Sequence, residues 1–548
     1  MFRKINLIIL LIFILEVLSF LIFLEPQLRS LVVFCISFLF LFLSLKDLKY
    51  GIAIILLELL IGSKGYLFYL EYDDTVVSIR IIFWLILMSV WIGGVLRELM
   101  QKFNFLQFKY FILNRENYSL KNRFLKIIKF FKKVKGLEFF SARLFFIFLI
   151  FFIFLFFSLI LAFLNKNGFN NIFLDFNNWL YFVLIFPIYK KTKNISFEEF
   201  FCLLKLVFFS GLVWLVLKTF ILLFLFSHSD PDVLYLIYRW IRNTGVGEIV
   251  QIQGGFYRIF FQSHIFSLLG FFILLFSLNF SPKKYCIKKN IFKLIILGFL
   301  FAIILISFSR SFWIGFLVGL ILYEIFLLFY LKWRKILILN LNLVLVVVLS
   351  FLLIVVTVKF PYPKPLGGFE TSELFSKRAK AIKNESAVSS RWNLLPEIIK
   401  GIKKSPVWGY GFGKTVTYRS SDPRIVESSV DGEYTTYAFE WGFLDIWLKL
   451  GFFGLCAYLF LIINILFPDL KKFRVIKSNI LDNLKNLQNT EELIFTKIYL
   501  GLIVSVIVLL VVHFFTPFLN HPLGIGYLLL VYVIVLLISE NFSLDQKR

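Results

Sequence analysis

Residues 5–24 read INLIILLIFILEVLSFLIFL, an almost wholly apolar run that follows Arg3 and Lys4. About twenty such residues are what an α-helix needs to cross the hydrocarbon core of a bilayer. The run is too long for the apolar core of a signal peptide and lacks a small-residue cleavage site, so it predicts a membrane span that is retained. Similar runs recur along the 548 residues, which are 60% hydrophobic. The sequence therefore predicts an all-α, polytopic transmembrane helical bundle.

Hydropathy predicts about fourteen spans. They are expected at residues 5–24, 28–45, 48–63, 76–96, 144–163, 173–189, 200–227, 264–281, 292–308, 312–331, 336–358, 440–466, 493–515 and 522–539. We divide the chain into N-terminal transmembrane helices at 1–250 and a second membrane region at 251–548, which contains a large polar loop at 359–439. The four cysteines are scattered without the spacing of a metal site, so neither a metal nor a disulfide is expected. They are Cys35, Cys202, Cys286 and Cys456.

Basic residues are concentrated between the spans, and they account for most of the net charge of +26. Segment 97–143 is strongly basic, and the positive-inside rule places it in the cytoplasm. Counting spans outward puts the other short basic clusters and both termini on the same side. The segments 228–263 and 359–439 are then external. This distribution indicates a membrane protein whose charge sets its topology, and it gives no indication of nucleic-acid binding.

The external loop 359–439 is itself basic, against the usual bias. Long loops escape the positive-inside rule, so an external loop can be basic without any functional reason. Alternatively, its positive charge serves to bind an anionic ligand. Charged residues also occur inside the apolar runs, where each should face a partner or a cavity because unpaired charge is costly in lipid. They are Glu16, Glu58, Lys218, Glu324, Asp445 and Lys449.

Residues 389–413, SSRWNLLPEIIKGIKKSPVWGYGFG, form the most distinctive part of this loop. The two serines predict the cap of a short helix from Arg391 to about Lys404, which Pro406 would end. Three alternating glycines follow, and glycine allows tight turns and the close approach of a ligand. A basic helix followed by such a turn suits an anionic ligand, although a solvated basic surface helix has the same pattern. The residues expected to contact a ligand here are Trp392, Gly409, Gly411 and Gly413.

Three arginines are expected at the external edge of the membrane: Arg258, Arg310 and Arg391. The guanidinium group is permanently charged, and its planar fork of donors fits phosphate oxygens. A single arginine at a membrane edge commonly extends toward lipid headgroups instead. Three on one side favour a shared anionic ligand.

The blocks around these arginines resemble the O-antigen polymerase and O-antigen ligase superfamily. In chain order they are GGFYRIFFQSHIF at 254–266, FSRSFWIGFLVG at 308–319, the stretch 389–413, FEWGFLDIWLKLGFFGL at 439–455 and FFTPFLNHPLGIGYLLL at 514–530. The resemblance covers roughly residues 250–530. It implies an integral glycosyltransferase of the bacterial inner membrane that takes an undecaprenyl-pyrophosphate-linked glycan as donor on the external face and needs no metal or other cofactor. The implied partners are this donor, a glycan acceptor, membrane lipids and, where length is controlled, a chain-length regulator.

The resemblance assigns pyrophosphate binding to Arg258, Arg310 and Arg391, whose charge would stabilise the leaving group in the transition state. Ligases of the superfamily carry a histidine and an asparagine where this chain has Glu440 and Trp441. A carboxylate can also act as a general base toward an acceptor hydroxyl. Glu440 is therefore the candidate base, unless it only complements the positive end of its helix.

Asp431 and Glu433 are the reserve bases in the same loop, and His264 is a candidate acceptor contact. Because the loop contains no histidine, the sequence favours a polymerase that joins repeat units of a surface polysaccharide. The alternatives are an O-antigen ligase that transfers glycan to a lipid A-core or other acceptor, and a lipid-linked-glycan flippase.

Overall fold

The computed structural model describes residues 2–545 except 73–74, 103–141, 195–196, 231, 253–254, 279–283, 367–385, 422–425, 427–431 and 468–490. Within these ranges, eleven helical stretches are long and apolar enough to cross a membrane. Ten of these stretches lie in the helices α1 (Phe2–Leu24), α2 (Arg29–Lys46), α4 (Ile79–Lys102), α7 (Ala142–Leu164), α10 (Phe197–His228), α13 (Lys284–Ser307), α14 (Arg310–Tyr330), α15 (Trp333–Val358), α19 (Gly442–Leu466) and α21 (Glu491–Phe515), and the eleventh, Phe169–Thr192, is made of shorter helices. A further long helix, α22 (Pro522–Asp545), has a shorter apolar part at Pro522–Ile538.

Shorter helices complete the bundle and its connections. They are η1 (Pro26–Leu28), α3 (Leu48–Ile61), α8 (Phe169–Phe176), η2 (Trp179–Leu184), α9 (Ile185–Asn194), α11 (Tyr235–Asn243), η3 (Gln262–His264), α12 (Ile265–Phe276) and α17 (Ser386–Lys404). Every predicted apolar run overlaps helix, which confirms the all-α polytopic class. The predicted span 173–189 is broken into α8, η2 and α9 rather than one straight helix. The total of about fourteen crossings stays a prediction.

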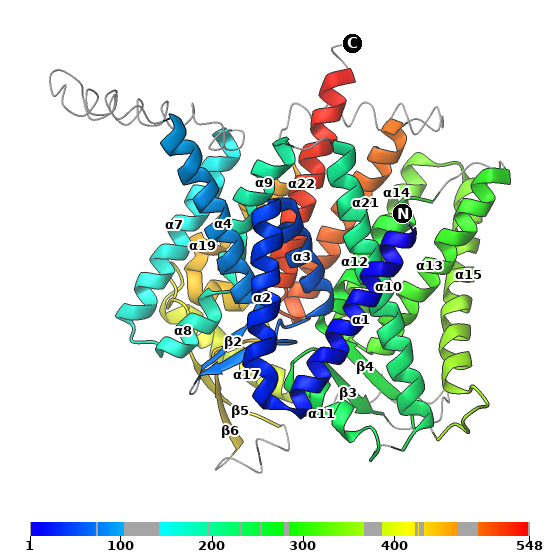
Figure 1. Ribbon diagram of the computed structural model, residues 1–548, viewed down its shortest axis with the longest axis horizontal. Helices are drawn as coiled ribbons and strands as arrows, with labels where there is room; N and C mark the ends of the chain where they lie inside the picture. Colours follow the sequence, from blue (N-terminus) through cyan, green and yellow to red (C-terminus); the bar gives the residue numbers. More distant parts are fainter. Residues whose placement is uncertain are drawn as a thin grey trace.

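Three antiparallel strand pairs lie between the helices. They are β1 (Tyr69–Tyr72) with β2 (Thr75–Ser78), β3 (Gly247–Gln251) with β4 (Tyr257–Phe261), and β5 (Val416–Arg419) with β6 (Glu433–Thr436). Figure 1 shows them at one end of the bundle together with α8, α11 and α17, which we call the loop end. Both termini lie at the opposite, terminal end. The even number of spans predicted from the basic clusters would place both termini on one side of the membrane, and it stays a prediction.

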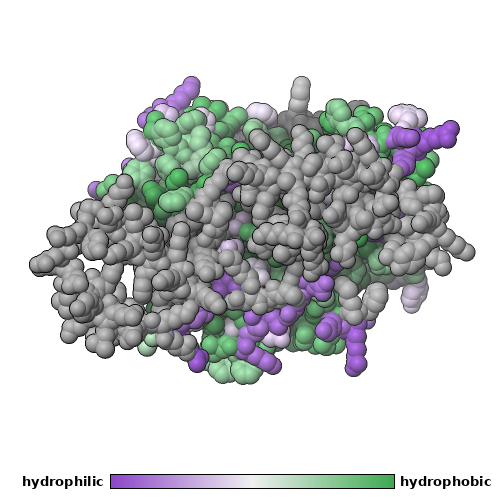
Figure 2. Space-filling view, turned by 90° about the horizontal axis from the view of Figure 1, so that it is seen from above, coloured by the Kyte–Doolittle hydropathy of each residue, from purple (hydrophilic) through white to green (hydrophobic). Residues whose placement is uncertain are grey.

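Large apolar side chains are exposed on the outer helices, for example Phe34 and Phe38 on α2 and Leu345 on α15. Seen from the terminal end, hydrophobic residues line much of the rim of the described part, with hydrophilic side chains at a few places (Figure 2). Such a surface would be unfavourable in water and is suited to lipid.

The charged residues inside the apolar runs have polar partners, as predicted. Burying an ion is tolerable only when a counter-ion and hydrogen bonds compensate for lost hydration. The contacts are Glu16–Lys218 at 2.7 Å, Glu58–Arg80 at 2.7 Å, Asp445–Lys449 at 2.7 Å and Glu324–Asn340 at 3.3 Å.

Candidate functional site at the loop end

Helix α17 packs on the beginning of α19 through a single apolar face. Leu394, Ile398 and Ile402 recur at four-residue intervals and are buried in a cluster with Phe439 and Trp441. This spacing places them on one side of the helix, so the basic residues of its last turn face outward. The basic face is thus solvated, and the helix is held to the membrane region by its apolar side.

The start of α17 differs from the prediction. The helix begins at Ser386, so Ser389 and Ser390 lie inside it rather than capping it at Arg391. The Ser390 hydroxyl accepts a hydrogen bond from the Ser421 backbone N–H at 2.8 Å. The serines therefore join α17 to the end of β5, because a serine hydroxyl can bond a loop backbone as well as a helix end. The helix ends at Lys404, as predicted.

The glycine loop 409–413 packs tightly against neighbouring helices. Gly409, Gly411 and Gly413 all have positive φ, at 72°, 81° and 72°. A Cβ on Gly411 would lie 2.2 Å from the Ala162 backbone nitrogen, and those on the other two would lie 2.6 Å from backbone atoms. The atoms that approach these glycines are protein backbone, which corrects the expectation that the glycines make room for a ligand.

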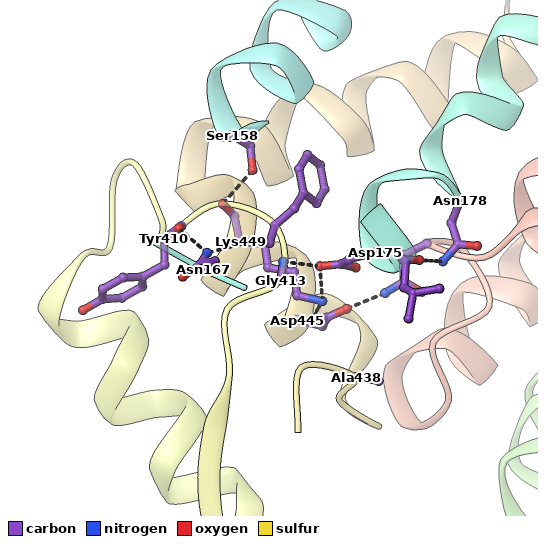
Figure 3. Close-up of polar contacts among 12 residues, drawn as sticks. Ser158, Asn167, Asp175, Asn178, Tyr410, Gly413, Ala438, Asp445 and Lys449 are labelled. Carbon is purple, nitrogen blue, oxygen red and sulfur yellow. Dashed lines mark hydrogen bonds and ion pairs between the residues drawn. The ribbon is translucent and has the colours of Figure 1, made fainter. Parts of the chain in front are cut away.

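A buried charge cluster fixes this loop (Figure 3). The Lys449 ammonium lies 2.8 Å from an Asp175 carboxylate oxygen and 2.7 Å from Asp445. Asp175 also accepts a hydrogen bond from the Gly413 backbone N–H at 2.9 Å, and Asn520 donates to Asp445. One cluster therefore connects α8, the glycine loop, α19 and the turn before α22.

Asp175 is the member that the sequence analysis missed. It lies in α8, 238 residues before Gly413, with which it bonds. The pairing of Lys449 with Asp445 was predictable because residues four apart share a helix face. The contact with Asp175 depends on tertiary structure, and only its place in an apolar segment marked it as needing a partner.

Arg391 and Glu440, the predicted phosphate ligand and the predicted base, form an ion pair. Their side chains are 38% and 48% exposed, so the pair is open to solvent at the loop end. The Trp441 indole N–H donates to the Arg391 carbonyl oxygen at 3.1 Å. The Trp392 ring, on the same turn of α17, meets the Trp441 ring edge-on with centroids 5.7 Å apart.

The other two arginines lie on neighbouring elements. Arg258, on β4, donates from Nε to the Ser307 carbonyl oxygen at 2.8 Å, which fixes it beside the turn between α13 and α14. Arg310 is the first residue of α14, and the next residue, Ser311, accepts a hydrogen bond from Thr516 at 3.1 Å. The Arg258 and Arg310 segments therefore meet where α13 ends and α14 begins.

The end of α21 connects this corner to the Arg391–Glu440 pair. Trp441 packs edge-on against Phe514, with centroids 5.8 Å apart, only two residues before Thr516. Residues 514–516 thus contact Ser311, next to Arg310, and Trp441, which bonds the Arg391 backbone.

The remaining predicted residues are less central. His264 is fully buried and contacts the Thr219 hydroxyl at 3.0 Å, so its ring faces α10 rather than the protein surface. Glu433 is exposed on β6, opposite Arg419 in the strand pair. Trp392 is 59% exposed and is the aromatic side chain beside the ion pair that a ligand can reach. Asp431 lies outside the described residues.

Comparison with known protein families gives one match: residues 294–459 fit the family model described as O-antigen ligase. The matched segment contains Arg310, Arg391 and Glu440, while Arg258 precedes it. No curated protein and no solved structure gives a significant match. The family match supports a ligase- or polymerase-type function and lends no support to a flippase. The match at residues 294–459 therefore supports the O-antigen polymerase and ligase superfamily, which the sequence motifs predicted.

Proposed function

We propose that this protein is a polymerase that joins undecaprenyl-pyrophosphate-linked repeat units on the external side of the membrane. The observation that carries the proposal is the ion pair of Arg391 with Glu440 at the loop end, where the segments of Arg258 and Arg310 also lie. Together they offer cations for a leaving pyrophosphate and a carboxylate for an acceptor hydroxyl. These are the two groups that transfer from such a donor requires.

The exposed pair is well suited to exchange partners when the donor binds. Ion pairs that are this exposed typically contribute only about 0–1 kcal/mol. A pyrophosphate carries more charge than one carboxylate and accepts two parallel hydrogen bonds from arginine. Donor binding would therefore draw Arg391 away from Glu440 and free the carboxylate to accept a proton.

In the transfer step the acceptor hydroxyl oxygen forms a bond to the anomeric carbon of the donor sugar. The bond from that carbon to the pyrophosphate oxygen breaks, and the pyrophosphate leaves with the electron pair. The hydroxyl proton passes to Glu440. Arg258, Arg310 and Arg391 stabilise the negative charge on the leaving group.

A ligase is the second candidate, because the matched family model is described as O-antigen ligase and fits either activity. We favour the polymerase because a carboxylate, Glu440, stands where ligases of the superfamily carry histidine. The two activities use the same donor and differ in the acceptor.

Deleting the gene and profiling the surface glycan tests the proposal and separates the two activities. A polymerase mutant should display single repeat units on its final acceptor. Accumulation of long lipid-linked polymer would identify a ligase, and an unchanged glycan would refute both. Restoring the deletion with wild-type protein serves as the control.

A further inference from the structure

Exposed lysines gather at the end of α17 that lies away from Arg391. They are Lys400, Lys403 and Lys404, which we call the lysine cluster. Lys400 forms an exposed ion pair with Glu397 at 3.5 Å, and the other two form no ion pair with any residue that the structure describes. The cluster therefore carries two net positive charges. Because a helix rises about 1.5 Å per residue, it lies about 18 Å along α17 from Arg391 and is separate from the proposed site of transfer.

The chain turns directly after the lysine cluster and presents an exposed tryptophan. Trp408 is 54% exposed. Its ring contacts Phe157 of α7 and Phe453 of α19, with centroids 5.3 and 6.3 Å apart. The Trp447 indole N–H donates to the Pro406 carbonyl oxygen at 2.8 Å, which ties the turn to α19. These contacts hold Trp408 on the outer surface of α7 and α19.

This outer surface is apolar and faces away from the bundle. On α19, exposed large apolar side chains begin at Phe452 and Phe453, directly after the part of the helix that α17 covers. On α7, Phe156 and Phe163 are exposed on either side of Phe157 in sequence. Such a surface is suited to lipid and not to water. The turn after α17 therefore lies beside the bilayer, where the lipid-facing part of α19 begins.

A tryptophan next to lysines is typical of the boundary between lipid and water. The indole ring favours the level of the headgroups, where aromatic residues form a belt around membrane proteins. A lysine stem can lie along apolar surface while its ammonium reaches the headgroups. Each lysine near an anionic membrane surface strengthens the attraction about fivefold. Charge and aromatic surface are thus combined here in the way that an anionic lipid requires.

We propose that the lysine cluster and Trp408 together form a binding surface for anionic phospholipid of the surrounding bilayer. The ammonium groups contact the headgroup phosphate, and the Trp408 ring lies against the first part of the acyl chains. A soluble anion would use the lysines but would leave the exposed ring in water. The lipid would hold this end of α17 at the membrane while the other end presents Arg391. The inference goes beyond the proposed function, because it concerns bulk lipid and not the glycan donor.

Photo-crosslinking of the purified full-length protein in phosphatidylcholine nanodiscs tests this surface. Phosphatidylglycerol and phosphatidylcholine probes, with a diazirine at the same acyl position, are added separately at equal low fractions and constant ionic strength. Mass spectrometry then compares the yields on the peptide that contains Trp408. Phosphatidylglycerol should be favoured about fivefold or more. In the double variant Lys403→Gln/Lys404→Gln the preference should fall to near one, because only the Lys400–Glu397 pair remains.

The chain offers a control position and a control variant. Phe34 is an exposed residue of α2, five positions after Arg29, whose charge is paired with Glu71. Peptides that contain Phe34 should crosslink to both lipids equally. Lys359 and Lys364 are exposed lysines just after α15. The double variant Lys359→Gln/Lys364→Gln should keep the wild-type preference at Trp408.

Three results would overturn the proposal. Equal yields of the two lipids at Trp408 would mean that the lysines are only solvated or bind a soluble anion. A preference that survives in Lys403→Gln/Lys404→Gln would assign it to other groups. Crosslinks at Phe34 without any at Trp408 would place the turn in water. Because no glycan donor is present, these results are independent of transfer, and the proposed function stands or falls separately.

Discussion

Arg391, in the second turn of α17, and Glu440, two residues before α19, form an ion pair across 49 residues of sequence. Sequence analysis assigned them opposite tasks, one to hold the leaving pyrophosphate and the other to accept a proton. While they are paired, Arg391 is not free to bind pyrophosphate and Glu440 is not free to accept a proton. We propose that binding of the anionic donor separates them.

Glu440→Gln should abolish most transfer while leaving donor binding intact or stronger. The amide keeps the shape of the side chain, cannot act as base, and no longer competes as an anion for Arg391. General base catalysis typically contributes about 100- to 10,000-fold to a rate. Polymer length and donor binding, measured on the same proteoliposome preparation, check both parts of the prediction.

Glu433→Gln and Asp431→Asn are the controls for that variant and should retain most activity. A fully active Glu440→Gln beside an inactive control would move the base into the loop. Full activity in all three would mean that no carboxylate proposed here acts as base, and that catalysis depends on the arginines.

Replacing Arg258, Arg310 or Arg391 singly by lysine should reduce activity strongly while the protein still inserts. Lysine keeps the charge but loses the planar fork that matches phosphate oxygens. Each lost charge-assisted contact is worth about 1.5–3 kcal/mol, or roughly ten- to hundredfold in rate. Initial rates at saturating acceptor, for membranes with equal protein content, provide the measurement.

Arg242→Lys offers a matched control, since Arg242 also lies at the loop end but donates to the Tyr238 hydroxyl of its own helix, α11. It should transfer at the wild-type rate. Normal polymerisation by all three arginine variants would contradict the assignment of pyrophosphate binding to these arginines.

The helical class and the placement of most elements followed from the sequence, because membrane-length apolar runs leave the backbone no other way to satisfy its hydrogen bonds. The pairing of Asp445 with Lys449 followed from their spacing on one helix face. The role of the glycines did not, because the backbone that packs against Gly411 comes from α7, far away in the sequence. Nor did the partner of Glu58, since the sequence analysis singled out Glu58 but not Arg80.

Alanine at Gly411 should destabilise the protein more than alanine at Gly409 or Gly413. All three positions have positive φ, which costs an L-residue about 1–2 kcal/mol, and the Cβ at Gly411 would make the closest backbone contact. Gly93→Ala is the control, because nothing lies within 4 Å of its added Cβ. Thermal unfolding in detergent should rank Gly411→Ala lowest and leave Gly93→Ala near wild type. A wild-type melting temperature for Gly411→Ala would contradict the packing described.

The loop end should be external and the terminal end cytoplasmic. A membrane-impermeant thiol reagent applied to intact spheroplasts should label Ser421→Cys, at the loop end, and not Lys332→Cys, between α14 and α15. The background protein has its native cysteines replaced by serine. These are Cys35, Cys202, Cys286 and Cys456. The reverse labelling would place the arginines in the cytoplasm and remove the basis of the proposed function.

Lys449→Met should be among the most damaging single substitutions. In the part of the chain that the structure describes, Lys449 is the only cation that pairs with both Asp175 and Asp445, and all three side chains are at most 8% exposed. Removing one partner of a buried ion pair typically costs about 3–5 kcal/mol, and here two carboxylates would be left facing each other. Asp175→Asn should cost less, because it leaves Lys449 and Asp445 as a neutral pair and loses mainly the charged acceptor of the Gly413 N–H.

Lys218→Met distinguishes a local effect from a general loss of stability. It breaks the similarly buried Glu16–Lys218 pair, which lies between α1 and α10. Both lysine variants should unfold at lower temperature, but only Lys449→Met should also release the glycine loop and make it sensitive to protease added at the loop end. That difference follows because Lys449 holds Asp175, which in turn holds Gly413. Equal protease sensitivity of the two variants would show that the charge cluster stabilises the bundle as a whole and does not specifically anchor the loop beneath the Arg391–Glu440 pair.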